Sequence, residues 1–329
     1  MKAAYINQTG PASSIVFGEL PQPRPTDEQV LVKVEAVDVN PIDTYVRSGK
    51  VAMRLPIPYV VGCDLAGVVE AVGSRVTSIR VGDRVWGSNQ GLLGRQGTFA
   101  EYACVDQQWL YATPAGVSSE DAAALSLVGI TAALGLRYAA LAAGEMLFVN
   151  GGSGGVGSAV VQMAKALGAR VITTAGSPEK LARCRELGAD LAIDYKSPEV
   201  DAQIKEFAPR GINVWWETVS LPDFDRTVGL LAPRGRIVLM AGRDARPQFP
   251  VGPFYVKGCS MFGFAMFNAP ADEQRACAEG INGWLASGKL KANIDRVLPL
   301  SQAAAAHQLQ EDNTIGKANT LSGKIVLKP

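Results

Sequence analysis

The stretch that decides the fold runs from residue 146 to 177 and reads MLFVNGGSGGVGSAVVQMAKALGARVITTAGS. Gly152, Gly154 and Gly157 have the spacing G-x-G-x-x-G. A lone match to that spacing is weak evidence. Here, however, the glycines follow an apolar run typical of a buried strand (146–150), and they open a helix over about 155–167. This strand, turn and helix context favours a dinucleotide-binding loop over a turn without a ligand.

Each glycine has an expected role in such a loop. Gly152 permits the tight turn, Gly154 lets the backbone approach a pyrophosphate, and Gly157 lets the helix pack closely. The amides of the first helical turn and the positive end of the helix then bind the phosphates. The sequence therefore predicts cofactor contacts from the loop residues Gly152, Ser153, Gly154, Gly155, Val156 and Gly157.

The end of the next strand (170–176) favours one cofactor. An NAD site usually carries Asp or Glu there, about 20 residues past the motif, to accept a hydrogen bond from the ribose 2′-hydroxyl. This strand is instead followed by Ser177 and then Lys180. A hydroxyl and an ammonium suit a 2′-phosphate, so we expect NADPH. Ser177 also suits a helix N-cap, and Lys180 is alternatively a solvated helix lysine.

Composition excludes several classes of function. The chain has 329 residues, which favours two domains, and a net charge of +1, which gives no electrostatic case for nucleic acid or an acidic membrane. We see no signal peptide, and the apolar stretch 122–136 is short for a membrane span. Five scattered cysteines and a single histidine suit a reducing cytoplasm and make a zinc site improbable.

The pattern of the chain changes at about Ser118. Before it, strand-like segments at 2–6, 30–37, 60–72, 76–86 and 99–105 alternate with turns. After it, buried strands alternate with helices, and the strands include 146–150, 170–176, 191–195, 213–219 and 236–242. Such alternation is typical of a doubly wound parallel sheet. The expected fold is α/β, a β-rich domain plus a Rossmann domain.

Several further segments carry a family resemblance over essentially the whole chain. They are VDVNPIDTYVRSG (37–49), VVGCDLAGVVEAVGSRV (60–76), VGDRVWG (81–87), GTFAEY (97–102), LVGITAALGL (127–136) and the glycine run. With these segments the chain resembles the zinc-free, zeta-crystallin-like quinone oxidoreductase branch of the medium-chain dehydrogenase/reductase superfamily. The resemblance implies a GroES-like catalytic domain from residues 1–122 and 268–329, with a Rossmann NADP-binding domain at 123–267.

The resemblance also bears on metal content. Zinc enzymes of the superfamily place a cysteine where this chain has Asn40, a histidine at Cys63 and a further cysteine at about Val128. The loop at 87–97 lacks the four cysteines of their structural zinc lobe. We therefore expect no metal.

Further cofactor contacts are implied by the resemblance alone. Thr131 is expected at the nicotinamide, Tyr195 at the adenosine 2′-phosphate and Gly242 along the cofactor groove. The backbone of Phe264, Ala265 and Met266 is expected at the carboxamide. Relatives are typically homodimers joined through the Rossmann sheet edge, which the resemblance places at the strand-like region 261–264. The role of the longer C-terminal segment 312–322 stays open.

Without zinc, neutral donors must stabilise the charge on the acceptor oxygen. Asn40 offers an amide NH₂ and Tyr45 a phenol, so these two residues are the catalytic candidates. Packing roles are the alternatives for both. Asp43 is interpreted as orienting its neighbours, Arg47 and Lys50 as surface charges, His307 as structural and Trp215–Trp216 as core.

The expected function is NADPH-dependent transfer of hydride to a small-molecule quinone or α,β-unsaturated carbonyl acceptor. No residue is required as a general acid, because the product anion of such an acceptor takes a proton from water. The alternative is an NADPH-binding protein of crystallin-like or RNA-binding type with little turnover. The near-zero net charge weighs against RNA. The two classes of acceptor stay unresolved.

Overall fold

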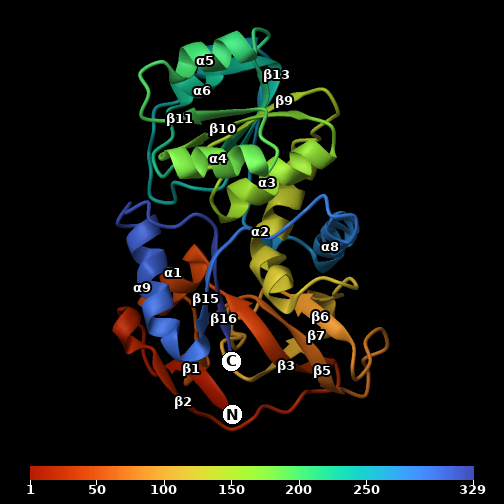
Figure 1. Ribbon diagram of the computed structural model, residues 1–329. Coiled ribbons are helices and arrows are strands. Elements are labelled where there is room, and N and C mark those ends of the chain that lie inside the picture. The colour runs from red at the N-terminus through yellow and green to blue at the C-terminus, as the bar shows by residue number, and fades with distance from the viewer. The chain divides into compact units, whose positions relative to one another are not determined.

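A computed structural model describes residues 1–329, and the chain forms two compact units (Figure 1). Unit 1 comprises Met1–Ile130, Pro270–Ala286 and Lys291–Pro329. Unit 2 comprises Thr131–Ala269 and Ser287–Leu290. Unit 1 is therefore assembled from both sides of unit 2 in the sequence.

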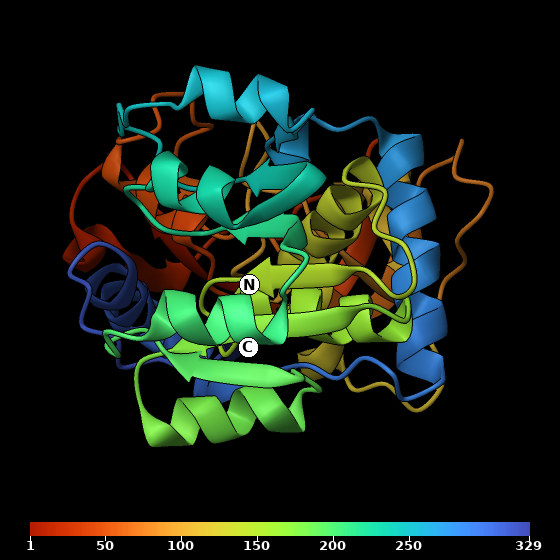
Figure 2. The same ribbon diagram turned by 90° about the horizontal axis from the view of Figure 1, so that it is seen from above.

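Unit 2 is a doubly wound sheet. Its six strands lie in the order β11-β10-β9-β12-β13-β14, and all the pairings are parallel. The strands are β9 (Met146–Val149), β10 (Arg170–Ala175), β11 (Leu191–Asp194), β12 (Ile212–Glu217), β13 (Leu231–Leu239) and β14 (Ser260–Gly263). The helices are α3 (Gly155–Ala166), α4 (Pro178–Glu186), α5 (Val200–Phe207), α6 (Phe224–Leu230) and α7 (Val251–Val256). Seen from above, helices lie on both faces of this sheet (Figure 2), which confirms the predicted Rossmann architecture.

The core of unit 2 forms where the central strands meet. Phe148 on β9 stacks on Trp215 of β12 with ring centroids 3.9 Å apart, and both side chains are fully buried. Trp216 is fully buried as well. The Trp pair is therefore core, as predicted, because strands covered by helices on both faces bury both sets of alternating side chains.

Unit 1 is strand-rich. A three-stranded sheet has the order β2-β1-β4, and a seven-stranded sheet has the order β15-β16-β3-β5-β6-β8, with β7 also paired to β3. The strands are β1 (Lys2–Ile6), β2 (Val16–Glu19), β3 (Gln29–Asp38), β4 (Tyr59–Val60), β5 (Leu65–Val72), β6 (Arg84–Gly87), β7 (Tyr102–Asp106), β8 (Leu110–Ala112), β15 (Ile294–Pro299) and β16 (Lys324–Lys328). The helices are α1 (Pro41–Ser48), α8 (Ala271–Ala286) and α9 (Ala303–Thr314), and α2 (Ser119–Tyr138) begins here. Four 3₁₀ turns complete the chain: η1 (Ala12–Ser14), η2 (Gln107–Trp109), η3 (Met266–Asn268) in unit 2 and η4 (Leu300–Gln302).

The extended region expected over 60–72 is interrupted. Gly62 has a φ of +97°, and a Cβ there would meet the Phe99 ring at 2.1 Å. The chain therefore breaks between β4 and β5, which join different sheets. The region expected as a strand over 76–86 shortens to β6 for a similar reason, because a turn with Gly82 at φ +90° immediately precedes that strand.

The Ser118 side chain caps the start of helix α2. Ser118 Oγ accepts a hydrogen bond from the Asp121 backbone N–H at 3.0 Å and lies 2.7 Å from the Asp121 carboxylate. The helix is longer than its apolar stretch suggested, and it is the one helix with the length and composition to cross a membrane. Its most apolar window is 83% buried within the protein, as in the core helix of a folded domain.

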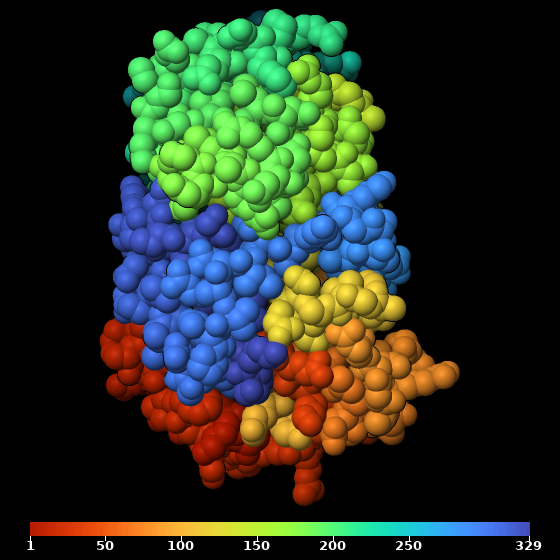
Figure 3. Space-filling view, viewed as in Figure 1, coloured from red at the N-terminus to blue at the C-terminus, as the bar shows by residue number.

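Helix α9 packs against α1 and the N-terminal turn η1. Figure 3 shows N-terminal residues (red) and C-terminal residues (blue) of unit 1 side by side at the surface. Arg47 on α1 is fully buried and forms an ion pair with Glu311 of α9 at 2.7 Å. The interpretation of Arg47 as a surface charge was wrong. The reason is that the covering helix lies more than 250 residues further along the chain, whereas Lys50, just beyond α1, is exposed.

Candidate functional site

The glycine loop joins β9 to α3 at the carboxyl end of the central strands, where doubly wound sheets bind their ligands. The residue with the left-handed backbone is Gly151, with a φ of +67°. A Cβ at Gly152 would lie 2.3 Å from the Thr173 side chain, and one at Gly157 would lie 2.2 Å from the Gly151 carbonyl oxygen. The turn therefore belongs to Gly151, while Gly152 and Gly157 are needed because the loop packs against its neighbours.

Helix α3 presents its N-terminus at this loop. Gly154 is the N-cap and has extended backbone, and no side chain caps the helix. The free first-turn amides of Gly155, Val156 and Gly157 are the donors that bind anions at helix N-termini. A Cβ on Gly154 would meet only the Gly151 carbonyl oxygen, at 3.3 Å. The loop thus fits a dinucleotide pyrophosphate.

A buried carboxylate that the sequence reasoning missed supports this loop. Glu217 ends β12 and is 3% exposed. Its Oε1 accepts from Asn150 Nδ2 at 3.0 Å and from the Val219 N–H at 2.8 Å, and its Oε2 accepts from Trp215 Nε1 at 3.1 Å. Glu217 therefore fixes the residue that precedes the glycines. The signal available in the sequence was a single acid at the end of an otherwise apolar strand.

The end of β10 lacks a carboxylate, as the sequence indicated. Ser177 is the N-cap of α4 and accepts from the Lys180 backbone N–H at 3.4 Å. The Lys180 residue is 9% exposed, and Tyr195 is 50% exposed. Lys196, which the sequence analysis did not select, donates from Nζ to the Gly176 carbonyl at 2.6 Å. The Ser177 hydroxyl and Lys180 therefore lie at the turn that follows β10, and Lys196 lies at the turn that follows β11.

The structure places the remaining expected cofactor residues at other points of unit 2. Thr131 on α2 is 5% exposed, and Met266 is 4% exposed. Phe264, which follows β14, packs edge to face with Tyr138 at 5.3 Å, and Ala265 follows it as the N-cap of η3. Gly242 has a φ of +79°.

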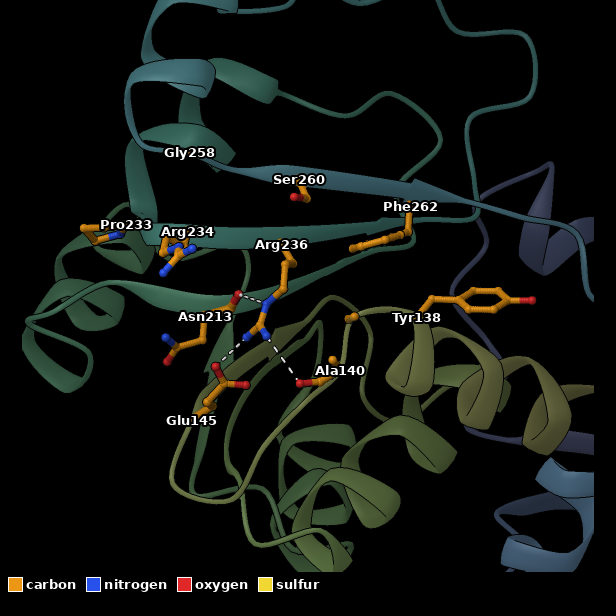
Figure 4. A pocket seen from close by; sticks show the side chains of 11 residues that line it. Tyr138, Ala140, Glu145, Asn213, Pro233, Arg234, Arg236, Gly258, Ser260 and Phe262 are labelled. Atoms are coloured by element: carbon orange, nitrogen blue, oxygen red, sulfur yellow. Dashed lines mark hydrogen bonds and ion pairs between the residues drawn. The ribbon is translucent and has the colours of Figure 1, made fainter. Parts of the chain in front are cut away.

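Figure 4 shows a polar pocket in unit 2. It is lined at the amino ends of the strands, where Arg236 pairs with Glu145 at 2.6 Å and Ser260 begins β14. Ligands of parallel sheets bind at the opposite, carboxyl ends. The Arg236 donors are already occupied by Glu145, the Ala140 carbonyl and the Asn213 carbonyl. This pocket is therefore distinct from the dinucleotide loop.

The second set of candidate residues lies in unit 1, where α1 follows β3. Asn40 is the N-cap of α1, and its backbone N–H donates to Asp43 Oδ2 at 2.7 Å. Asp43 thus orients its neighbour, as expected. The Asn40 side chain does not cap the helix. Tyr45, one turn into the helix, is partly exposed.

The Asn40 side chain instead belongs to a buried polar network. Its Oδ1 accepts from Lys324 Nζ at 2.6 Å, and its Nδ2 donates to Asp64 Oδ2 at 2.9 Å. Lys324 also pairs with Asp38 at 2.6 Å and donates to the Val39 carbonyl at 2.9 Å. Asp38, Asn40 and Asp64 are fully buried, and Lys324 is 5% exposed. We call Asp38, Asn40, Asp64 and Lys324 the Asn40 network.

Burial controls the protonation of this region. It raises the pKa of Asp64 well above its usual range, and the charge of the nearby Asp38 raises it further. Burial also raises the pKa of Asp43 to about 7, and it raises the pKa of the Cys63 thiol well above its ordinary value. Burial therefore disfavours the charged form of Asp64, while Asp38 forms the ion pair with Lys324.

The donors at the positions of the superfamily's zinc ligands do not fit a zinc ion. Val128 offers no donor atom, the Asn40 amide oxygen is occupied by an ammonium, and Cys63 is a buried thiol rather than a thiolate. Zinc binds Cys as the thiolate. In addition, no group of three or more His, Cys, Asp or Glu residues is arranged to hold a metal ion.

Known proteins share this architecture. The family model described as "Alcohol dehydrogenase GroES-like domain" matches residues 26–115, and the one described as "Zinc-binding dehydrogenase" matches residues 155–280. The pig (Sus scrofa) quinone oxidoreductase is 34% identical over 301 residues, which cover 91% of this chain and 90% of the pig protein.

NADPH is named for two further relatives. An NADPH-dependent alkenal/one oxidoreductase from Arabidopsis thaliana chloroplasts is 33% identical and covers 96% of this chain and 75% of its own length. The crystal structure of Escherichia coli quinone oxidoreductase complexed with NADPH matches with a TM-score of 0.86 and 26% identity, over the full length of both chains.

Proposed function

Because this chain belongs to the quinone oxidoreductase branch of the medium-chain dehydrogenase/reductase superfamily, we propose that it transfers hydride from NADPH to a quinone or an α,β-unsaturated carbonyl compound without zinc. The observation that carries the proposal is the glycine loop at the carboxyl end of β9, next to a β10 that ends without a carboxylate. Oxidoreductase activity follows from the family, whereas the choice of cofactor and acceptor is the proposal.

The preference for NADPH is supported by chemistry at the end of β10. The Ser177 hydroxyl and the Lys180 and Lys196 ammonium groups suit a 2′-phosphate, and no acid at that strand end repels it. Tyr195 lines the same phosphate in this proposal. NADPH is also the cofactor named for the Arabidopsis and Escherichia coli relatives.

The rest of the cofactor is held by residues of unit 2 in this proposal. The pyrophosphate binds at Gly152, Ser153, Gly154, Gly155, Val156 and Gly157, and Gly154 leaves the approach to the loop without a Cβ. Thr131, Gly242, Phe264, Ala265 and Met266 contact the nicotinamide half. When bound, NADPH supplies the hydride, and the chain's own residues bind and orient the reactants.

Asn40 and Tyr45 act as hydrogen-bond donors to the acceptor oxygen. As hydride adds to the acceptor, negative charge develops on that oxygen, and neutral N–H and O–H donors stabilise it. The oxygen or carbon then takes a proton from water, so that one hydride and one proton reduce a quinone to a hydroquinone. No zinc is used, because the donors at those positions do not suit it.

The experiment that tests the function measures NADPH and NADH oxidation with a panel of quinones, enals and enones. We expect turnover with conjugated acceptors and a preference for NADPH. Tight binding of NADPH with no turnover on any acceptor would instead support a crystallin-like or RNA-binding protein. Asn40→Ala and Tyr45→Phe should each lower kcat while leaving NADPH affinity intact, and loss of cofactor binding would show that both residues are misplaced.

A homodimer is part of the proposal. Strand β14 pairs with β13 on one side, and its other edge is unpaired within the chain. An exposed strand edge is a template for pairing with a second chain. Light scattering should give twice the 34.7 kDa of the chain, whereas a mass of one chain would contradict pairing at this edge.

A further inference from the structure

Lys324 is the first residue of β16, and its long side chain ends deep inside unit 1. The strand pairs with β3 through Val326 opposite Asp38. The ammonium therefore lies where β3 ends and α1 begins, and it contacts Asp38, the Val39 carbonyl and Asn40 Oδ1. A charge this buried is costly unless it is paired and hydrogen-bonded, and here all three contacts are acceptors.

The ammonium decides how the Asn40 amide is oriented. A lysine ammonium has only donors, so the amide atom at 2.6 Å from it must be the oxygen. The NH₂ group is thereby turned to the opposite side, where one N–H donates to Asp64 Oδ2 at 2.9 Å. The second N–H is left to donate to another acceptor. Without the ammonium, only Asp64 Oδ2 would hold the amide in this orientation.

The far side of the amide is also fixed by the fold. Asp64 Oδ2 accepts from the Leu127 backbone N–H at 3.0 Å, and the Asp64 carbonyl accepts from Thr98 Oγ1 at 2.7 Å. The acid that receives Asn40 is thus tied to α2 and to the loop before β7. The amide is held from both ends, and an ammonium on its oxygen also polarises the N–H groups toward stronger donation.

We propose that Lys324 is a positioning residue for hydride transfer, which fixes the amide of Asn40 so that an N–H, and not the carbonyl, faces the acceptor oxygen. This inference rests on the proposed function, because it assigns how the Asn40 donor is prepared.

The test neutralises the ammonium together with its carboxylate partner Asp38, and the Val39 carbonyl and Asn40 Oδ1 lose a donor in the same change. In Asp38→Asn/Lys324→Met both members of the ion pair become neutral, so the variant is expected to fold and to bind NADPH with wild-type affinity. We expect kcat with a quinone to fall about tenfold or more, as for the loss of a transition-state donor. Lys328→Met is the matched control, because Lys328 lies on the same strand and pairs with Glu120 at the surface; its kcat should equal wild type.

A double-mutant cycle identifies the route of action. If Lys324 acts through Asn40, then adding Asp38→Asn/Lys324→Met to Asn40→Ala lowers kcat no further, although each change alone lowers it. Wild-type kcat in Asp38→Asn/Lys324→Met, or losses that multiply in the combined variant, would overturn the inference and show a purely structural ion pair. Absence of wild-type turnover with every acceptor would instead overturn the proposed function, and the inference with it.

Discussion

The glycine loop of unit 2 and the Asn40 network of unit 1 depend on different physical requirements. The loop is built from one continuous stretch, it presents backbone amides, and it depends on the absence of side chains at Gly152 and Gly157. The network is built from side chains of three segments that are remote in the chain, and it depends on buried charges being matched. Steric space governs the first region, and electrostatic pairing governs the second.

The largest expected effect tests pairing in the network. Lys324→Met alone leaves the Asp38 carboxylate buried without its ammonium, and such breaks typically cost about 3–5 kcal/mol of the free energy of unfolding. Denaturant unfolding should show this loss, with most of it recovered in Asp38→Asn/Lys324→Met. An equally stable single variant would mean that the charge of Asp38 is not matched by Lys324.

The next effect tests space in the loop. Gly157→Ala places a Cβ about where the Gly151 carbonyl oxygen lies, so the loop must shift and NADPH affinity should fall about a hundredfold, or about 2.7 kcal/mol. Fluorescence titration measures it. Gly280→Ala in α8 is the control, since nothing lies within 4 Å of its Cβ; it should leave affinity unchanged and slightly stabilise the helix. Unchanged affinity in Gly157→Ala would contradict the crowded loop.

A third effect tests how the buried His307, which has no hydrogen-bond partner, changes the free energy of unfolding with pH. Burial, together with the nearby charge of Arg47, lowers the pKa of His307 to about 3. Only the unfolded chain then binds a proton as the pH falls from about 6.5 to about 3, so stability is lost on acidification. Relative to His307→Phe, the wild type should lose up to about 1.4 kcal/mol per pH unit in this window.

Because His307 is the sole histidine, the difference between the two proteins isolates its titration. The raised pKa of Asp43 has the opposite sign, since it makes the native state bind the extra proton between pH 3.8 and about 7, and it cancels in the comparison. Parallel curves of unfolding free energy against pH would show that His307 is not buried in the neutral form.

The smallest effect tests the charge at the edge of the loop region. Lys180→Ala should lower the preference for NADPH over NADH about tenfold, or about 1.4 kcal/mol, measured as the ratio of kcat/KM for the two cofactors. Lys205→Ala on the exposed face of α5 serves as the control. A preference that survives Lys180→Ala would assign the 2′-phosphate to Lys196 and Ser177 instead.

The same contrast explains how much the sequence could predict. The Rossmann strands and the loop follow from local spacing, so β9, α3, β10 and the N-cap Ser177 lie where expected. Tertiary packing decided the rest. Helix α1 was not expected, because its apolar spacing is interrupted by Asp43 and Arg47, which are buried only through partners elsewhere.

Lys324 shows the limit most clearly. In the sequence it is one lysine among 32 basic residues, in a run (GKIVLKP) that reads as an ordinary terminal strand. Its function in the fold depends on Asp38 and Asn40, nearly 290 residues earlier. Pattern and spacing report on neighbours within a turn or a strand, and they carry no information on a pair brought together by sheet topology.

The place of β16 in the chain has a consequence for biosynthesis. Asp38, Asn40 and Asp64 are all synthesised before the whole of unit 2, and Lys324 after it. Domains fold as units during synthesis, the N-terminal parts first, so unit 2, which is complete at Leu290, can fold while unit 1 still lacks its ammonium. A nascent chain would therefore complete its cofactor-binding unit before the Asn40 network, and the network would be completed only when Lys324 is added.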